Sequence, residues 1–280
     1  MFWTIRRGHG VALMDGDDRY LFDNKARQAG DRFGALASLF DPVTFRHLDG
    51  LGIGPGQRCW EVGAGGGSVV RWMADRVGPS GFVWATDLDV HWLETDLQQP
   101  NVQISRHDVV RDEVLEDRFD VVHERLVLIH VPETVAAVER MVSALRPDGW
   151  LLVEDFDSEI GDGGYVDASS DIADLSRSIA AAVRNLLNMR GADTALGSKL
   201  PHLLRAAGLT DVRADAYKAL ECGDATRELI RANVVQVQDQ LVEHGLVTPD
   251  DLDRYIERLQ DDSLRLTSPT LVSAWGRRPA

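Results

Sequence analysis

The stretch Glu61-Val62-Gly63-Ala64-Gly65-Gly66-Gly67-Ser68 decides which fold this sequence predicts. It follows the short run Arg58-Cys59-Trp60 and precedes an amphipathic segment, an order that indicates a strand, a glycine turn and a helix. Glycines let the bare backbone come close to a ligand, and the first turn of a helix offers unpaired N–H groups at the positive end of its dipole. The stretch therefore predicts a ligand site where the first strand ends.

The spacing of the glycines narrows the class of ligand. Glu61 stands two positions before the first glycine, which gives the pattern Glu-x-Gly-x-Gly-x-Gly. A dinucleotide fingerprint would place its third glycine at position 68, where this chain has Ser68. The pattern therefore favours a nucleoside that carries a carboxylate and an ammonium group over NAD.

Short apolar runs and helical patterns alternate along the chain. Strands are expected at 57–62, 82–87, 102–106, 119–123 and 149–155, with two late strands near 211–220 and 269–276. Helices are expected between them at 68–77, 90–97, 134–145 and 200–207. This alternation predicts an α/β fold with a mostly parallel sheet and crossover helices.

Further helices are expected before and after this core. Residues 24–48 have apolar positions at helical spacing that Asp41-Pro42 interrupts, so one or two helices precede the first strand. Later helices are expected at 168–190, 224–244 and 249–259, and Gly245 and the N-cap pattern Thr248-Pro249-Asp250-Asp251 separate the last two. The late helices either cover the sheet or form a roof over a substrate.

We expect a single domain over residues 1–280. Residues 1–50 would form an N-terminal lid and helices, 51–157 the ligand-binding core, and 158–199 with 224–262 a helical substrate cap. The N-terminus does not have the pattern of a secretory signal, and no window has the roughly 20 apolar residues of a membrane helix, so a cytoplasmic location is expected.

Composition excludes several classes of partner. The 30 basic and 45 acidic residues give a formal net charge of −15, which repels phosphate backbones and anionic membrane surfaces. We therefore expect a small-molecule partner, with no nucleic acid and no membrane, and a possible homodimer. Cys59 and Cys222 provide neither a disulfide framework nor the spacing of metal ligands, so no metal site is expected.

Acidic residues end the next strands, at the edge where ligands of open α/β sheets bind. Asp87 lies 22 positions beyond Gly65, close to the roughly 20 residues expected for a carboxylate that binds ribose hydroxyls. Asp108, after the third strand, is placed to accept a hydrogen bond from an adenine amino group. Two other roles stay open, since Asp87 could cap a helix and Asp108 could be a solvated loop acid.

From about residue 20 to residue 157 the chain resembles class I S-adenosylmethionine-dependent methyltransferases of the small-molecule type, including those of quinone and natural-product biosynthesis. The motifs that carry this resemblance are Glu61-x-Gly63-x-Gly65-x-Gly67, Asp87, His107-Asp108, Phe119-Asp120-Val121-Val122 and Leu145-Arg146-Pro147-Asp148-Gly149-Trp150-Leu151. The resemblance implies a Rossmann-like, mostly parallel seven-stranded sheet with helices on both faces and an antiparallel final strand. It also implies helical insertions over the active site.

The same resemblance implies S-adenosyl-L-methionine as the cofactor. The glycine turn would hold its methionine part, Asp87 its ribose, Asp108 its adenine, and the Glu124-Arg125 backbone its amine. The residues expected to bind it are Tyr20, Glu61, Gly63, Ala64, Gly65, Asp87, Leu88, His107, Asp108, Val109, Glu124 and Arg125.

Methyl transfer from a sulfonium is an in-line displacement, so the enzyme mainly aligns the two reactants, and a base is needed only if the acceptor must lose a proton. The candidate catalytic bases are Glu154, then His9, then His130. Each has a simpler alternative: Glu154 could pair with a surface cation, His9 could be an exposed terminal residue, and His130 could face a crossover helix.

The function expected from the sequence is methylation of a small aromatic or apolar acceptor in secondary metabolism. Two alternatives stay open. One is a quinone-ring methyltransferase, and the other is a protein that uses the same pocket without methylating, as a cyclase or a sensor.

Overall fold

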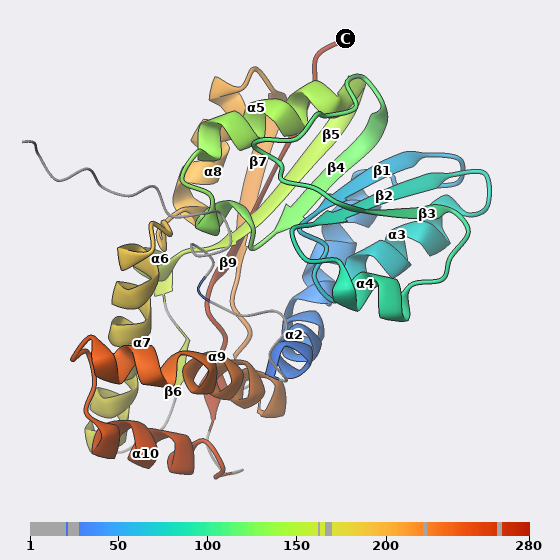
Figure 1. Ribbon diagram of the computed structural model, residues 1–280. Coiled ribbons are helices and arrows are strands. Elements are labelled where there is room, and N and C mark those ends of the chain that lie inside the picture. Colours follow the sequence, from blue (N-terminus) through green and yellow to red (C-terminus); the bar gives the residue numbers. More distant parts are fainter. Residues whose placement is uncertain (1–20, 22–27, 162, 166–169, 221–222, 262–264) are drawn as a thin grey trace, which may run out of the picture.

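The computed structural model of the chain describes residues 21, 28–161, 163–165, 170–220, 223–261 and 265–280 (Figure 1). Its main sheet has seven strands in the order β3-β2-β1-β4-β5-β9-β7. These strands are β1 (Arg58–Val62), β2 (Phe82–Asp87), β3 (Val102–Arg106), β4 (Phe119–Arg125), β5 (Leu145–Phe156), β7 (Thr210–Tyr217) and β9 (Leu271–Arg277). β9 runs antiparallel to both of its neighbours, whereas the pairs among β1 to β5 are parallel. The predicted mostly parallel sheet with an antiparallel final strand is confirmed.

Successive side chains of each buried strand point to opposite faces of the sheet, so both faces are apolar and helices cover both of them. On one face, Trp60 and Trp84 pack with α5 (Thr134–Ala144) and α8 (Leu200–Ala206). On the other face, Cys59 and Val83 pack with α3 (Ser68–Val77), α4 (His91–Asp96) and the end of α2 (Gln28–Gly50). Helices thus cover both faces of the sheet, and the loops that follow the parallel strands lie together at one edge of it.

α2 is one continuous helix, so the break expected at Asp41-Pro42 was wrong. A proline inside a helix costs about 3 kcal/mol, because it removes a backbone hydrogen bond and crowds the preceding turn. Phe40 and Val43, on either side of the proline, are buried to 0% and 3% exposure, and each such side chain stabilises the fold by about 1.5–3 kcal/mol. Tertiary packing therefore outweighs the local preference.

Three helices form a separate layer at one end of the sheet, drawn in yellow to red at the lower left of Figure 1. They are α7 (Ser170–Met189), α9 (Asp224–Glu243) and α10 (Pro249–Arg258). Ile179, Val237 and Tyr255 belong to their common apolar core. The predicted N-cap of α10 is confirmed, since the Thr248 side chain accepts a hydrogen bond from the backbone of Asp251.

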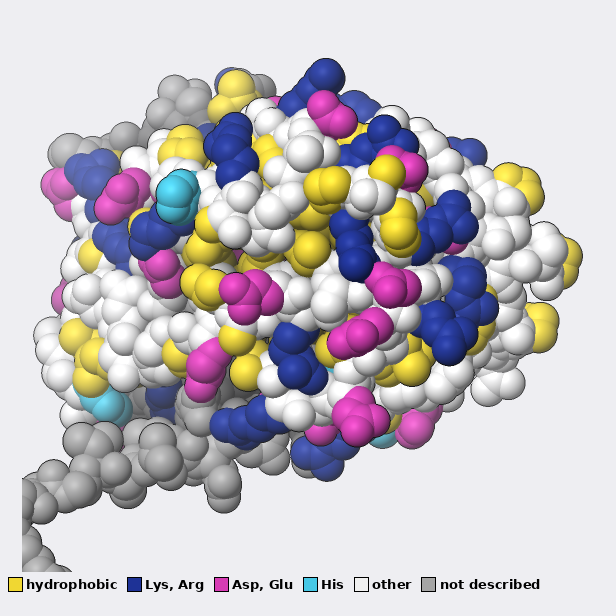
Figure 2. Space-filling model, turned by 90° about the horizontal axis from the view of Figure 1, so that it is seen from above, with side chains coloured by type: hydrophobic (Ala, Val, Ile, Leu, Met, Phe, Trp, Pro, Cys, Tyr) yellow, Lys and Arg dark blue, Asp and Glu magenta, His cyan; other side chains and the backbone are white. Residues whose placement is uncertain are grey.

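Shorter elements connect these parts of the fold. They are the two-stranded sheet of β6 (Gly164–Tyr165) and β8 (Leu266–Thr267), the helix α6 (Ser158–Gly161), and the 3₁₀ turns η1 (Leu128–His130) and η2 (Gly197–Lys199). Within the described ranges, no helix has both the length and the apolar character that crossing a bilayer requires. Figure 2 shows one face of the molecule, on which acidic and basic side chains are interspersed with hydrophobic ones.

Candidate active site

A cavity of about 1520 Å³ opens at the carboxyl ends of β1, β2, β3 and β4 and extends between α2, α7 and α9. This is the edge at which open α/β sheets bind their ligands. The predicted cofactor residues that line it are Glu61, Gly63, Ala64, Gly65, Asp87, Leu88, His107, Asp108, Val109 and Arg125. The fold thus gathers residues from four strand ends around one space.

The glycine turn forms one wall of the cavity from bare backbone. Gly63, Gly65 and Gly67 have φ angles of 64°, 50° and 75°, which side chains rarely permit. A Cβ added at Gly63 would lie 2.1 Å from Cγ2 of Val127, and one at Gly65 would lie 2.9 Å from Cε1 of Phe33. α3 begins directly after Gly67, and no side chain caps its first turn. This cradle fits the expected cofactor, whose methionine carboxylate suits a helix N-terminus.

Asp87 lies beside the glycine turn. Its carboxylate accepts hydrogen bonds from the backbone N–H groups of Gly65 at 2.9 Å and Asp89 at 3.0 Å. Burial raises the pKa of Asp87 above its ordinary value, although these N–H groups act in the opposite direction. The contacts hold the carboxylate at the cavity wall, where we expect the two ribose hydroxyls.

His107 and Asp108 form a wall at the end of β3. Asp108 Oδ1 accepts hydrogen bonds from the backbone of Val110 at 2.8 Å and Arg111 at 3.3 Å, so a tight turn fixes its orientation. The His107 ring packs edge-on against Trp84, with the ring centroids 4.9 Å apart. The adenine contact expected of Asp108 stays a prediction.

The turn after β4 faces the cavity through Arg125, Leu126 and Val127. Glu124 does not line the cavity among the described residues, because its buried carboxylate accepts from the backbone of Val127 at 3.0 Å and Leu128 at 3.4 Å. Burial raises the pKa of Glu124 to about 7, although these N–H groups lower it. Leu126 has a φ of 61°, a strained conformation of the kind that collects at functional sites. Glu124 therefore supports the turn from behind the cavity.

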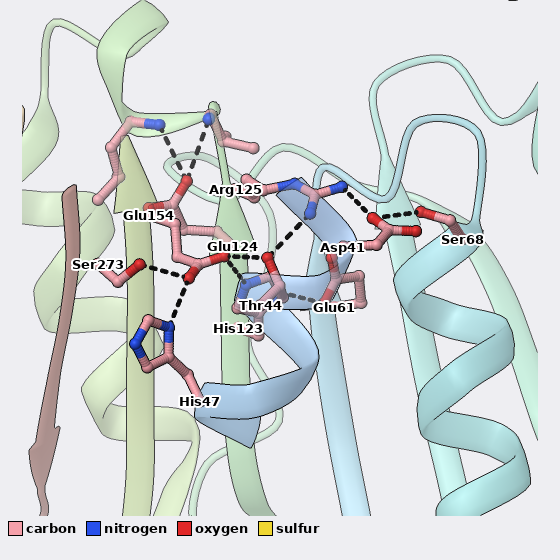
Figure 3. A network of polar contacts seen from close by, with 12 residues as sticks. Asp41, Thr44, His47, Glu61, Ser68, His123, Glu124, Arg125, Glu154 and Ser273 are labelled. Carbon is pink, nitrogen blue, oxygen red and sulfur yellow. Dashed lines mark hydrogen bonds and ion pairs between the residues drawn. The ribbon is translucent and has the colours of Figure 1, made fainter. Parts of the chain in front are cut away.

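Glu154 lies inside β5, fully buried, and is not among the residues that line the cavity. Its carboxylate accepts hydrogen bonds from Thr44, from Ser273 at 2.6 Å, and from the rings of His47 at 3.2 Å and His123 at 3.4 Å (Figure 3). Burial alone would raise the pKa of Glu154, but hydrogen bonds from His123 and His47 hold it well below its ordinary value. This geometry gives Glu154 a structural role in place of the expected catalytic one.

His130 ends η1 and lines the cavity. Burial, together with the nearby guanidinium of Arg32, lowers the pKa of His130 to about 4. Its imidazole is therefore neutral at pH 7 and can accept a proton. The other candidate base, His9, and the expected cofactor residue Tyr20 lie outside the described residues.

A second part of the cavity lining consists of apolar side chains from several segments: Leu21, Ala37, Phe156, Val183, Leu187 and Leu229. Arg190 and Asn233 add polar groups to this wall. Asn233 Oδ1 is buried, and no donor among the described residues reaches it. An apolar space with a few polar groups suits a small acceptor.

Sequence reasoning missed two sets of residues. Phe33 of α2 lies against the glycine turn and packs edge-on on Trp92, with centroids 6.1 Å apart. Its place in an apolar helical stripe is equally typical of core residues, so that pattern could not reveal it. One partner of Glu154 did leave a signal, because His123 is a polar residue inside a strand predicted to be buried.

The strand order, the glycine turn and the acidic strand ends define a class I S-adenosylmethionine-dependent methyltransferase. The sequence profile of a family described as "Methyltransferase domain" matches residues 19–214. The chain therefore belongs to this methyltransferase family. The resemblance, the fold and the cofactor that the sequence predicted are confirmed.

Individual relatives match over part of their length. The chain is 32% identical over 111 residues to "Methyltransferase str2" of Strobilurus tenacellus, covering 39% of each chain. It is 27% identical over 150 residues to the ubiquinone/menaquinone biosynthesis C-methyltransferase UbiE of Bordetella parapertussis, covering 48% of this chain and 58% of that protein. The chain thus spans about two fifths to three fifths of the length of these curated relatives.

Solved structures share the fold at low sequence identity. Phosphoethanolamine N-methyltransferase 2 of Haemonchus contortus, in complex with S-adenosyl-L-methionine, superimposes with a TM-score of 0.59 at 15% identity, covering 96% of this chain and 61% of that chain. At this identity the likeness extends to the fold and not to the acceptor.

Proposed function

We propose that this protein transfers the methyl group of S-adenosylmethionine to a small, apolar or aromatic acceptor in secondary metabolism. One observation carries this proposal: a single cavity joins the glycine cradle and Asp87 to an apolar wall from the cap helices. The first half suits a nucleoside with a charged amino-acid end, and the second suits an uncharged organic body. Residues 158–199 and 224–262 would then act as the roof over the acceptor.

When bound, S-adenosylmethionine supplies a methyl group on a positively charged sulfur that a nucleophile can displace in line. The chain's own residues do the remaining work. The glycine turn and Asp87 fix one reactant, and Phe156 and Leu229 exclude water around the other. Alignment of this kind corresponds to effective concentrations of about 10⁵–10⁸ M.

His130 is the candidate base that geometry favours. It lines the cavity, and its neutral imidazole can take a proton from a hydroxyl or amine of the acceptor during transfer. Asn233 Oδ1 would accept a hydrogen bond from a polar group of the acceptor. The expected acceptor is therefore a mainly apolar molecule with at least one donor group.

Transfer of label tests this function directly. The protein would be incubated with S-adenosylmethionine labelled in the methyl group and with a panel of phenols, quinols and aliphatic amines. Labelled product from an apolar member of the panel is the expected result, and His130→Asn should reduce the turnover of acceptors that must lose a proton. Conversion of an acceptor without incorporation of label would favour the cyclase, and cofactor binding without any product would favour the sensor.

A quinone ring is the second candidate acceptor. The stretch similar to the UbiE protein of Bordetella parapertussis covers 48% of this chain, and a quinol combines an apolar body with hydroxyl donors. A demethylated quinol in the same panel separates this candidate from other aromatic acceptors.

A further inference from the structure

The register of the sheet places charged side chains of three strands in adjacent rows on one face. Glu61 of β1 pairs with His123 of β4, and one row further Arg125 pairs with Glu154 of β5, which pairs in turn with Ser273 of β9. Paired residues point to the same face of a sheet. α2 covers this face, and Figure 3 shows the five labelled side chains between these strands and α2.

His123 bridges two carboxylates, and this geometry fixes its charge. Its Nδ1 lies 2.7 Å from Glu61 Oε2, and its Nε2 lies 3.4 Å from Glu154 Oε2. Carboxylate oxygens only accept hydrogen bonds, and a neutral imidazole has only one N–H to donate. With both carboxylates ionised, both contacts are satisfied only if His123 is an imidazolium ion.

The bridge continues along the same face of the sheet, towards the β7 edge, through His47. The Nδ1 of His47 lies 3.2 Å from Glu154 Oε1, and its Nε2 lies 3.1 Å from Asp215 Oδ2. Asp215 is 45% exposed, so the chain of charges starts at the cavity and ends at the surface. A guanidinium nitrogen of Arg46 also lies 3.4 Å from His47 Nε2 and contacts the same Asp215 carboxylate.

We propose that His123 is a positioning residue, which holds Glu61 ionised and directed along the glycine turn so that the carboxylate receives the cationic amino end of the cofactor. This inference rests on the proposed function. Glu61 is suited to that task because it is the one member of the chain of charges, besides Arg125, that lines the cavity. Because Glu61 is only 3% exposed, its ionisation depends on the charged side chains buried behind it.

The electrostatics agree with this geometry. Burial raises the pKa of Glu61, and the His123 charge and hydrogen bond oppose that rise, with Arg125 adding to the effect. Burial alone would lower the pKa of His123, but Glu61 and Glu154 raise it to about 10. The groups that face His123 are Glu61 from β1 and Glu154 from β5, and the charge of Glu124 on its own strand also interacts with it, while Arg125 on that strand acts on Glu61. Without the imidazolium, the buried Glu61 would take up a proton and lose its attraction for a cation.

A comparison of two nucleosides isolates the effect of His123 on the binding of the cofactor's amino end. S-adenosylhomocysteine has the amino-acid part, whereas 5′-methylthioadenosine has the same adenosine and lacks that part. Binding of each would be measured by calorimetry for the wild type, for His123→Asn and Glu61→Gln, and for Ser273→Ala as a control that touches Glu154 from the opposite side. Thermal unfolding of each variant would verify that it is folded.

We expect His123→Asn to weaken the binding of S-adenosylhomocysteine about 10- to 100-fold, as for the loss of a charge-assisted contact. The affinity for 5′-methylthioadenosine should change by less than about twofold. Affinity of this variant should recover as the pH rises and Glu61 ionises, whereas the wild type should be insensitive between about pH 6 and 8. Ser273→Ala should leave both affinities unchanged. If His123→Asn does not fold, Glu61→Gln must still show the same selective loss.

Equal losses for both nucleosides, or no loss for either, would overturn the positioning role and leave the proposed function intact. A wild-type protein that binds neither nucleoside would overturn the proposed function, and the positioning role with it.

Discussion

The two halves of the cavity are built by different means. The cofactor half consists of backbone, with glycines at positive φ and carboxylates held by N–H groups, and a network of buried charges lies behind it. The acceptor half consists of apolar side chains from α2, β5, α7 and α9, which are far apart in the sequence. Backbone shape tolerates few substitutions, whereas an apolar wall tolerates many that conserve volume. We therefore expect substitutions in the first half to act on cofactor affinity and those in the second to act on acceptor choice.

The largest effect should come from the charges beneath the cofactor half. Glu154→Gln removes a carboxylate that accepts hydrogen bonds from both His47 and His123. The two rings then lack a charged acceptor. Breaking a buried ion pair on one side typically costs about 3–5 kcal/mol. Urea unfolding should show a loss of this size, and a loss below about 1 kcal/mol would contradict the network's structural role.

The same network predicts a pH range of greatest stability. The pKa of His123 is raised to about 10 in the fold, so its contribution is complete below its unfolded pKa of about 6.5 and disappears as pH rises through about 10. The pKa of Glu154 is lowered, so its contribution is complete above its unfolded pKa of about 4.3 and is lost as pH falls. Melting temperatures of the wild type should therefore be highest between these limits, and Glu154→Gln should flatten the profile.

A smaller effect is expected at the cradle itself. Gly63→Ala adds a methyl group 2.1 Å from Val127 at a φ of 64°, so strain and overpacking together should cost about 2–4 kcal/mol and abolish nucleoside binding. Gly78→Ala is the matched control, because Gly78 has a φ of 63°, open space around its Cβ position and no place in the cavity wall. It should lose about 1 kcal/mol of stability and no affinity for S-adenosylhomocysteine. Similar affinities of the two variants for S-adenosylhomocysteine would contradict the role of the glycine turn in nucleoside binding.

Asp87→Ala should weaken the binding of S-adenosylhomocysteine about 10- to 100-fold, because the two ribose hydroxyls would lose a charged hydrogen-bond acceptor. Calorimetry measures this directly. Asp75→Ala removes an exposed carboxylate of α3 that accepts a hydrogen bond from the Gln99 amide, and this control should bind S-adenosylhomocysteine normally. Unchanged affinity in Asp87→Ala would remove the ribose assignment.

The smallest effect should appear in the acceptor half. Asn233→Ala removes one hydrogen-bond acceptor and should raise the acceptor KM about three- to tenfold, with cofactor affinity unchanged. Asn188→Ala, on α7 outside the cavity wall, should leave both constants unchanged. A loss of cofactor affinity in Asn233→Ala would break the division between the two halves.

Local patterns predicted the elements around the glycine turn well, and the reason is physical. A glycine turn, a strand and a helix N-terminus are decided within a few residues, so α3 was predicted at its observed bounds, Ser68–Val77. The acidic strand ends followed from the rule that parallel strands share one edge. Tertiary packing decided what local pattern could not, as in the continuous α2 through Pro42.

The expected base failed for a related reason. Glu154 was expected near the end of the strand predicted at 149–155, and β5 does end close by at Phe156, but the Glu154 side chain lies on the face of the sheet that α2 covers. Which face a strand residue takes follows from register with its neighbours, and the sequence of one strand does not contain that register. The apolar wall around Leu229 was beyond prediction because it joins segments whose proximity only the fold creates.

The position of β9 has a consequence for assembly. It lies between β5 and β7, although 114 residues (157–270) separate β5 from β9 along the chain. At about 5–20 residues per second, a ribosome needs roughly 6–23 s to make that interval, during which β5 is an open edge and Glu154 has no Ser273 beside it. Until β9 is made, the parallel part of the sheet ends in a pairing-competent border, and the strand that closes it is inserted next to the edge of the finished sheet, antiparallel to both neighbours.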